Sequence, residues 1–229
     1  MMQDIASRLR RDGRVAGALY LVVVLAGMVC LAYVPSRTGA TLAEAAAHAD
    51  LFRAGIAAFL MMQIAFLLVP LALYRVLADV DRRAAVLMVA LAAVSVPIGL
   101  AAVTHRLEAL TLLQGADAGE AAQAAFAVSI QRYGYGLRIA SLFWGLWLLP
   151  FGWLVLRSAR LPRLLGLLLV LGGIGYVVKV FGGLVPGFAD SAFAQYATLP
   201  AALGEIGSCL WLLAFGARQG RMAAPVSRS

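Results

Sequence analysis

The sequence predicts an all-α membrane protein, a bundle of six transmembrane helices. Three observations predict it: an apolar composition, six long apolar segments, and arginines placed between those segments. Of the 229 residues, 63% are hydrophobic and 13% are charged, and the mean hydropathy is +0.90. Soluble domains are about 45–50% apolar and roughly 25% charged. A water-soluble fold could not bury so much apolar surface, so we expect the lipid bilayer to cover much of the outside.

Six apolar segments are long enough to cross a hydrocarbon layer of about 30 Å at about 1.5 Å per helical residue. They are residues 15–34, 54–77, 84–104, 139–156, 164–185 and 199–217. Residues 1–14 are expected to form an N-terminal tail with amphipathic character, 15–217 the transmembrane domain, and 218–229 a C-terminal tail. The boundaries near Arg138 and Glu205 are the least sharp, because charges intrude there.

The first apolar segment follows Arg8, Arg10, Arg11 and Arg14, a pattern that also begins secretory signals. The apolar region of a signal is usually only about 7–15 residues long, and this segment is longer. Val29 before Cys30 does not fit a lipoprotein cleavage site. The segment is therefore interpreted as a membrane anchor.

The arginines predict the orientation. Thirteen of the nineteen basic residues fall on one side of the predicted membrane. They are Arg8, Arg10, Arg11, Arg14, Arg75, Arg82, Arg83, Arg157, Arg160, Arg163, Arg218, Arg221 and Arg228. Because positive residues concentrate on the cytoplasmic side, both termini are expected in the cytoplasm and the protein in the inner (cytoplasmic) membrane of the cell. The same placement accounts for the net charge of +8, so no nucleic-acid partner is expected.

The first and third connections, both on the outer side, are predicted to carry short surface helices. Thr41 and Glu44 have the spacing of a capping box, which would begin a helix running through Ala49. The stretch 118–132 is rich in alanine and spaces Phe126 and Ile130 four residues apart. It either lies as a helix on the outer surface or extends the fourth transmembrane helix.

Lys179 and Glu205 are the clearest ionisable residues inside predicted spans, where a charge costs about 2.5–3.5 kcal/mol. Lys179 and Glu205 each lie six residues inside the outer end of their segment, at similar predicted depths. Gly175 and Gly183 share a helix face with Lys179, and small residues mark close helix packing. We expect both charges to face the bundle, where they could form an ion pair. The pair could serve packing alone, or Lys179 could extend to the interface.

More polar residues are predicted at the same outer level, at the ends of the third and fourth helices. They are either solvated helix ends or members of one polar pocket with Lys179 and Glu205. The candidate ligand-binding residues are His105, Arg106, Glu108, Tyr135, Arg138, Lys179 and Glu205.

The cysteine and histidine content predicts neither a metal site nor a cofactor. Cys30 and Cys209 lie in separate apolar segments at different depths, so no disulfide is expected. No clustered Cys/His spacing is present. Haem bound through His105 and His48 is a minor alternative. Gln63 is interpreted as an interhelical hydrogen-bonding residue, and Pro97 and Pro150 as tolerated helix prolines that can kink the chain.

Several stretches resemble a bacterial multi-pass membrane family, domain of unknown function 4386, over about residues 12–217. They are 51–55 (LFRAG), 105–109 (HRLEA), 133–136 (YGYG), 157–166 (RSARLPRLLG), 199–205 (LPAALGE) and 211–213 (WLL). The resemblance implies that Lys179 occupies a variable position. It therefore favours Arg106 and Glu108 on the third helix, and Glu205 on the last, as site residues. It implies no activity.

Three functions remain open on the sequence. The first is a non-enzymatic protein that binds or moves a small lipophilic or anionic ligand, such as a lipid, in an outward-facing polar pocket. The second is a structural or accessory protein whose buried charges serve helix packing. The third is an intramembrane lipid-modifying enzyme with Glu108 or Glu205 as acid or base and His105 assisting, although no nucleophile or metal motif supports it. The sequence leaves the oligomeric state open.

Overall fold

The computed structural model describes residues 2–115 and 119–218, and this part of the chain is helical without strands. Helix α1 (Met2–Gly27) continues through a π-helical segment (Met28–Tyr33) into α2 (Val34–Thr38). The later elements in chain order are α3 (Leu42–Ala47), α4 (Ala49–Leu77), α5 (Arg82–Gln114), α6 (Glu120–Ser158), α7 (Arg163–Gly182), a 3-10 turn (Phe188–Asp190), α8 (Ala192–Tyr196) and α9 (Leu199–Phe215).

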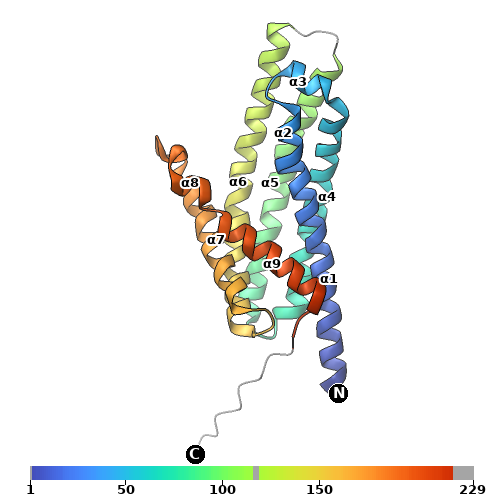
Figure 1. Ribbon diagram of the computed structural model, residues 1–229, viewed down its shortest axis with the longest axis vertical. Coiled ribbons are helices and arrows are strands. Elements are labelled where there is room, and N and C mark those ends of the chain that lie inside the picture. The colour runs from blue at the N-terminus through green and yellow to red at the C-terminus, as the bar shows by residue number, and fades with distance from the viewer. Residues whose placement is uncertain (1, 116–118, 219–229) are drawn as a thin grey trace, which may run out of the picture.

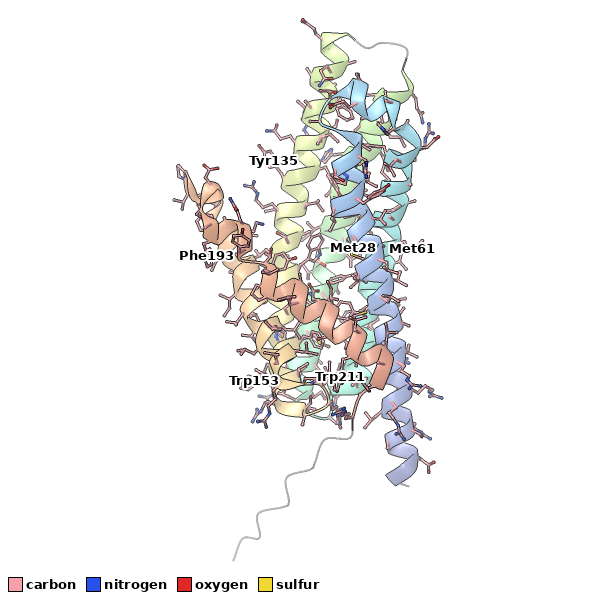
Figure 2. The ribbon with its side chains drawn as sticks, in the orientation of Figure 1. Met28, Met61, Tyr135, Trp153, Phe193 and Trp211 are labelled. Atoms are coloured by element: carbon pink, nitrogen blue, oxygen red, sulfur yellow. The ribbon has the colours of Figure 1, made fainter. Side chains whose placement is uncertain are left out.

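Six stretches of helix are long and apolar enough to cross a membrane, as predicted. They are Ala6–Thr38, Ala49–Leu77, Arg82–Gln114, Glu120–Ser158, Arg163–Gly182 and Ala192–Phe215. Large apolar side chains such as Met61, Trp153 and Phe193 remain exposed on the outer surface of the bundle (Figure 2). Lipid is the solvent that suits such a surface.

The six spans close into a ring. Contacts join α1 to α4, α4 to α5, α5 to α6, α6 to α7, α7 to α9, and α9 back to α1. In Figure 1, α4, α5 and α6 run nearly parallel, whereas α9 crosses them obliquely, and α8 with the end of α7 lies apart from α6. The side on which α1 begins and α9 ends is called the terminal side below, and the opposite side is called the far side.

Two apolar clusters fill the ring. The cluster toward the terminal side is built on Trp147. Its ring stacks on that of Phe151 with the ring centroids 5.4 Å apart, and it meets the ring of Phe66 edge-on with the centroids 5.3 Å apart. The far-side cluster contains Phe52 of α4 and Phe126 of α6, whose ring centroids are 6.3 Å apart. Trp144 packs against both clusters, and a cavity lies at this junction.

The first connection carries the predicted short helix, α3. The Thr41 side chain accepts a hydrogen bond from the Glu44 backbone N–H, and the Glu44 carboxylate accepts one from the Thr41 backbone N–H at 3.0 Å. These bonds lower the pKa of Glu44 below its usual range. The predicted capping box is confirmed.

The third connection differs from the prediction of a separate surface helix. Helix α6 is continuous from Glu120 to Ser158, so the alanine-rich stretch extends the fourth span, which was the alternative. Its added turns are packed: Gln123 Oε1 accepts a hydrogen bond from the Leu42 N–H at 2.8 Å, and Phe126 is buried. Residue 118 lies outside the described residues.

The ends of the chain also differ from simple tails. Helix α1 begins at Met2, so most of the residues that precede the first predicted span are helical and continuous with it. Of the predicted C-terminal tail 218–229, only Arg218 lies within the described residues, and its N–H bonds to the Arg160 carbonyl at 3.2 Å. Cys30 and Cys209 are both free and buried, and they belong to different apolar clusters.

Candidate functional site

Glu205 lies on the inward face of α9, near the middle of the span Ala192–Phe215. Its carboxylate Oε1 accepts a hydrogen bond from the Tyr20 hydroxyl of α1 at 2.9 Å. Tyr20 is fully buried, whereas Glu205 is half-buried because it borders a hollow in the bundle. A tyrosine buried in an apolar span needs a partner for its hydroxyl group, and Glu205 supplies it.

The hollow beside Glu205 is an apolar cavity of about 200 Å³. Four of its lining side chains carry a hydroxyl, amide or carboxyl group: Tyr20, Gln63, Tyr176 and Glu205. The remaining wall is apolar. Its residues are Val23, Val24, Gly27, Met28, Leu31, Met62, Phe66, Trp144, Ala202 and Ile206.

The mouth of this cavity lies on the flank of the bundle, between α1 and α9. Met28 on the α1 side and Ile206 on the α9 side both line the cavity and are 50% and 40% exposed. Figure 2 places Met28 near mid-height, away from both ends of the bundle. Met28 also begins the π-helical segment, and π-helical turns inside α-helices are frequent at functional sites. An apolar molecule could reach Glu205 from the lipid.

A second, larger cavity of about 700 Å³ lies toward the far side, between α6, α7 and α8. Arg138 and Lys179 both line it, and no carboxylate of the described chain does. Neither cation forms an ion pair with a carboxylate of the described residues. Leu31, Trp144 and Tyr176 line both cavities, so the two are neighbours that share a wall.

The ion pair expected between Lys179 and Glu205 is wrong: within the described chain Glu205 bonds to Tyr20, and no ion pair joins it to Lys179. Glycine contacts show the register between α7 and the last span. Gly175 faces the Ala197 carbonyl, and Gly204 faces the backbone of Leu168 and Leu169. Glu205 is therefore level with Leu168, about 11 residues from Lys179, or roughly 16 Å along α7.

The physical reason is the length of the last span. The prediction began that span at residue 199, whereas the structure adds α8 and begins it at Ala192. The extra residues place Glu205 deep in the bundle instead of near one end. Lys179 remains three residues from the end of α7.

The structure separates the other predicted residues from Glu205. Arg106 is only 4% exposed, and its guanidinium lies 4.3 Å from the ring centre of Phe52 and 5.1 Å from that of Tyr133. His105 Nδ1 lies 2.9 Å from a carboxylate oxygen of Glu108, at a half-exposed place. Tyr135 is 55% exposed at the edge of α6 (Figure 2). None of these side chains lines either cavity.

The chain was compared with known families and structures. The family model described as Domain of unknown function (DUF4386) matches residues 15–216. The chain belongs to this family. The resemblance drawn from the sequence stretches is thereby confirmed over nearly the same residues. No curated protein and no solved structure matches the chain.

In this DUF4386 protein, sequence reasoning missed the three aromatic residues that bring polar atoms to the Glu205 cavity: Tyr20, Trp144 and Tyr176. A signal for two of them exists. Tyr20 is the one aromatic residue among the aliphatic residues 15–32, and Tyr176 lies one turn from Lys179. Gln63 was interpreted correctly, since its Nε2 donates to the Val96 carbonyl on α5 at 3.2 Å.

Proposed function

We propose that this membrane protein binds a small amphiphile whose anionic group lies between Arg138 and Lys179. The observation that carries the proposal is the pair of cations facing one cavity of about 700 Å³ that no carboxylate lines. Unpaired positive charges in a recess attract anions, and arginine in particular binds carboxylates and phosphates in a bidentate manner.

The surroundings of this cavity favour an amphiphile over a free anion. The cavity borders the apolar Glu205 cavity, and apolar side chains such as Leu31 and Phe188 line it beside the cations. Small-molecule sites typically combine apolar walls with a few polar groups that fix the orientation of the ligand. The apolar part of the ligand would lie against these walls and the lipid.

We also infer that the far side, and with it this cavity, faces outward from the cytoplasm. Of the basic residues in the described part of the chain, eleven belong to the terminal side and six do not, and bases concentrate on the cytoplasmic side of multi-pass proteins. The inner membrane of a bacterium is the compartment that we propose.

The test measures thermal unfolding of the purified full-length chain in dodecyl maltoside with added phosphatidylglycerol, phosphatidylcholine or inorganic phosphate. Phosphatidylglycerol should raise the unfolding temperature by several degrees, since a ligand at 100 times its Kd stabilises by about 2.7 kcal/mol. Phosphatidylcholine and phosphate should not. A rise with phosphate alone would identify a free-anion site and overturn the amphiphile.

The test variant carries both Arg138→Gln and Lys179→Gln, and the control variant carries Arg132→Gln. Arg132 is exposed on the same helix and lines neither cavity. The double variant should lose the effect of phosphatidylglycerol, and the control should keep it. An undiminished effect in the double variant would remove these cations from the function.

A second candidate is a structural or accessory protein, and Arg106 and Arg160 favour it. Arg106 lies between aromatic rings, and Arg160 bonds to the Val76 carbonyl and Asp79. Both are buried charges that contact other parts of the fold, as a role in packing requires. On this alternative no lipid or anion would change the unfolding temperature selectively.

A further inference from the structure

The Glu205 cavity contains a second unusual group, the side-chain amide of Gln63. Gln63 is fully buried, and its Nε2 donates to the Val96 carbonyl at 3.2 Å. Because a carbonyl can only accept, this bond fixes the amide orientation and leaves Oε1 as the free end. Within the described residues Gln63 Oε1 has no hydrogen-bond partner, yet the side chain lines the cavity. Buried polar atoms rarely lack a hydrogen-bond partner, and each one that does calls for an explanation.

Glu205 likewise retains capacity to accept. Tyr20 occupies one lone-pair site of its carboxylate, whereas a carboxylate has about four. The Tyr20 hydroxyl hydrogen is already used in that bond. The cavity therefore offers acceptors from two helices, Gln63 Oε1 on α4 and the carboxylate on α9, and a ligand that satisfies both must donate.

The walls favour a cation. Tyr20, Phe66, Trp144 and Tyr176 line the cavity, and no arginine or lysine does. The faces of aromatic rings attract ammonium groups, most strongly where water is excluded. A cation beside Glu205 would also form a neutral pair in a place where an isolated carboxylate is costly.

We propose that the Glu205 cavity binds the protonated primary amine of a lipophilic molecule that enters from the lipid between α1 and α9. The ammonium group donates to the Glu205 carboxylate and to Gln63 Oε1, and its alkyl chain lies in the mouth beside Met28 and Ile206. A volume of about 200 Å³ suits a small head and not a whole drug-sized ligand, whose pockets are about 300–1,000 Å³.

This site is distinct from the anion site of the proposed function. Glu205 and Lys179 differ in level by roughly 16 Å along α7, and the two cavities carry opposite charge. The amine site stands or falls independently of Arg138 and Lys179.

The test is calorimetric titration of the full-length chain in dodecyl maltoside with octylamine, octanol, octanoate and octyltrimethylammonium. Octylamine should bind at least about tenfold more tightly than octanol, because it adds a charge-assisted hydrogen bond and a cation–π contact. Octanoate should not bind in this cavity. Octyltrimethylammonium has no N–H group and should bind more weakly than octylamine. If octanol or octyltrimethylammonium binds as tightly as octylamine, the proposal is overturned, and no variant is needed to show it.

Variants then locate the site. Glu205→Gln should weaken octylamine binding at least about tenfold, and Gln63→Leu about threefold to tenfold, since each removes an acceptor. Glu108→Gln is the matched control, because Glu108 lies outside the cavity. The double variant Arg138→Gln with Lys179→Gln should bind octylamine normally. Undiminished binding by Glu205→Gln would overturn the proposal; should that variant not fold, the ligand series and Gln63→Leu decide.

Discussion

At the scale of single residues, embedded charges in this protein have different surroundings, and the sequence shows only that they are embedded. Arg106 stacks between two rings, Glu205 borders a cavity, and Lys179 borders another. Apolar periodicity places a residue in a span and on a face. It does not report whether the facing helix offers a ring, a hydroxyl group or a hollow, because that depends on the register between helices.

Arg160 provides a prediction about pH. It follows the left-handed residue Ala159 at the end of α6, and it bonds to both carboxylate oxygens of Asp79. The hydrogen bonds from Arg160 hold the pKa of Asp79 below its usual range. The interaction is therefore fully present above the unfolded pKa of about 3.9 and is lost as the pH falls through the lower folded pKa.

We expect the unfolding temperature of the unmodified chain in detergent to fall when the pH is lowered from 6 to 3. The unfolding temperature of the Asp79→Asn variant should fall by less over the same range. The difference should correspond to about 1 kcal/mol at most, since the Asp79 side chain is 66% exposed and water screens the pair. Glu120→Gln, at an exposed position, should behave as the unmodified chain does. An identical pH dependence in Asp79→Asn would contradict the stabilising role of this pair.

At the scale of elements, helix α9 is held by close backbone approaches on both sides. A Cβ at Gly172 would overlap Ala201, and a Cβ at Gly17 would meet the backbone of Leu212 and Leu213. Small residues of this kind let membrane helices approach closely. The predicted small-residue face of α7 is thus correct at Gly175, which lies against Ala197. The prediction placed this part of α7 level with Glu205, whereas it lies level with the start of the last span.

Gly172→Ala should therefore destabilise the protein by about 1–3 kcal/mol, because α7 and α9 would have to separate to admit the methyl group. Gly134→Ala is the matched control, since nothing lies within 4 Å of a Cβ at that helical position. It should be neutral or stabilise by about 0.5–1 kcal/mol through higher helix propensity. Urea or thermal unfolding in detergent measures both. Equal effects of the two substitutions would show that the contact with Ala201 contributes little.

At the scale of the whole molecule, the sequence predicts the six spans well and their arrangement poorly. Spans follow from local hydropathy, and all six were found. The closed ring, the oblique α9 and the cavity at the junction of two apolar clusters depend on contacts between distant segments, such as that of Tyr20 with Glu205. The extension of α6 to Glu120 was one of two sequence alternatives, and packing on α3 and α4 decides it.

The orientation is a property of the whole molecule and gives the last prediction. Cys30 and Cys209 are buried, so replacing both with alanine yields a background for single cysteines. Ser7→Cys marks the terminal side and Glu120→Cys the far side, and both positions are exposed. A membrane-impermeant maleimide added to intact cells should label the cysteine at 120 and reach the one at 7 only after permeabilisation, because basic residues concentrate on the cytoplasmic side of multi-pass proteins. Labelling of both positions in intact cells would indicate dual insertion, and the reverse pattern would place the far side, with the Arg138 and Lys179 cavity, in the cytoplasm.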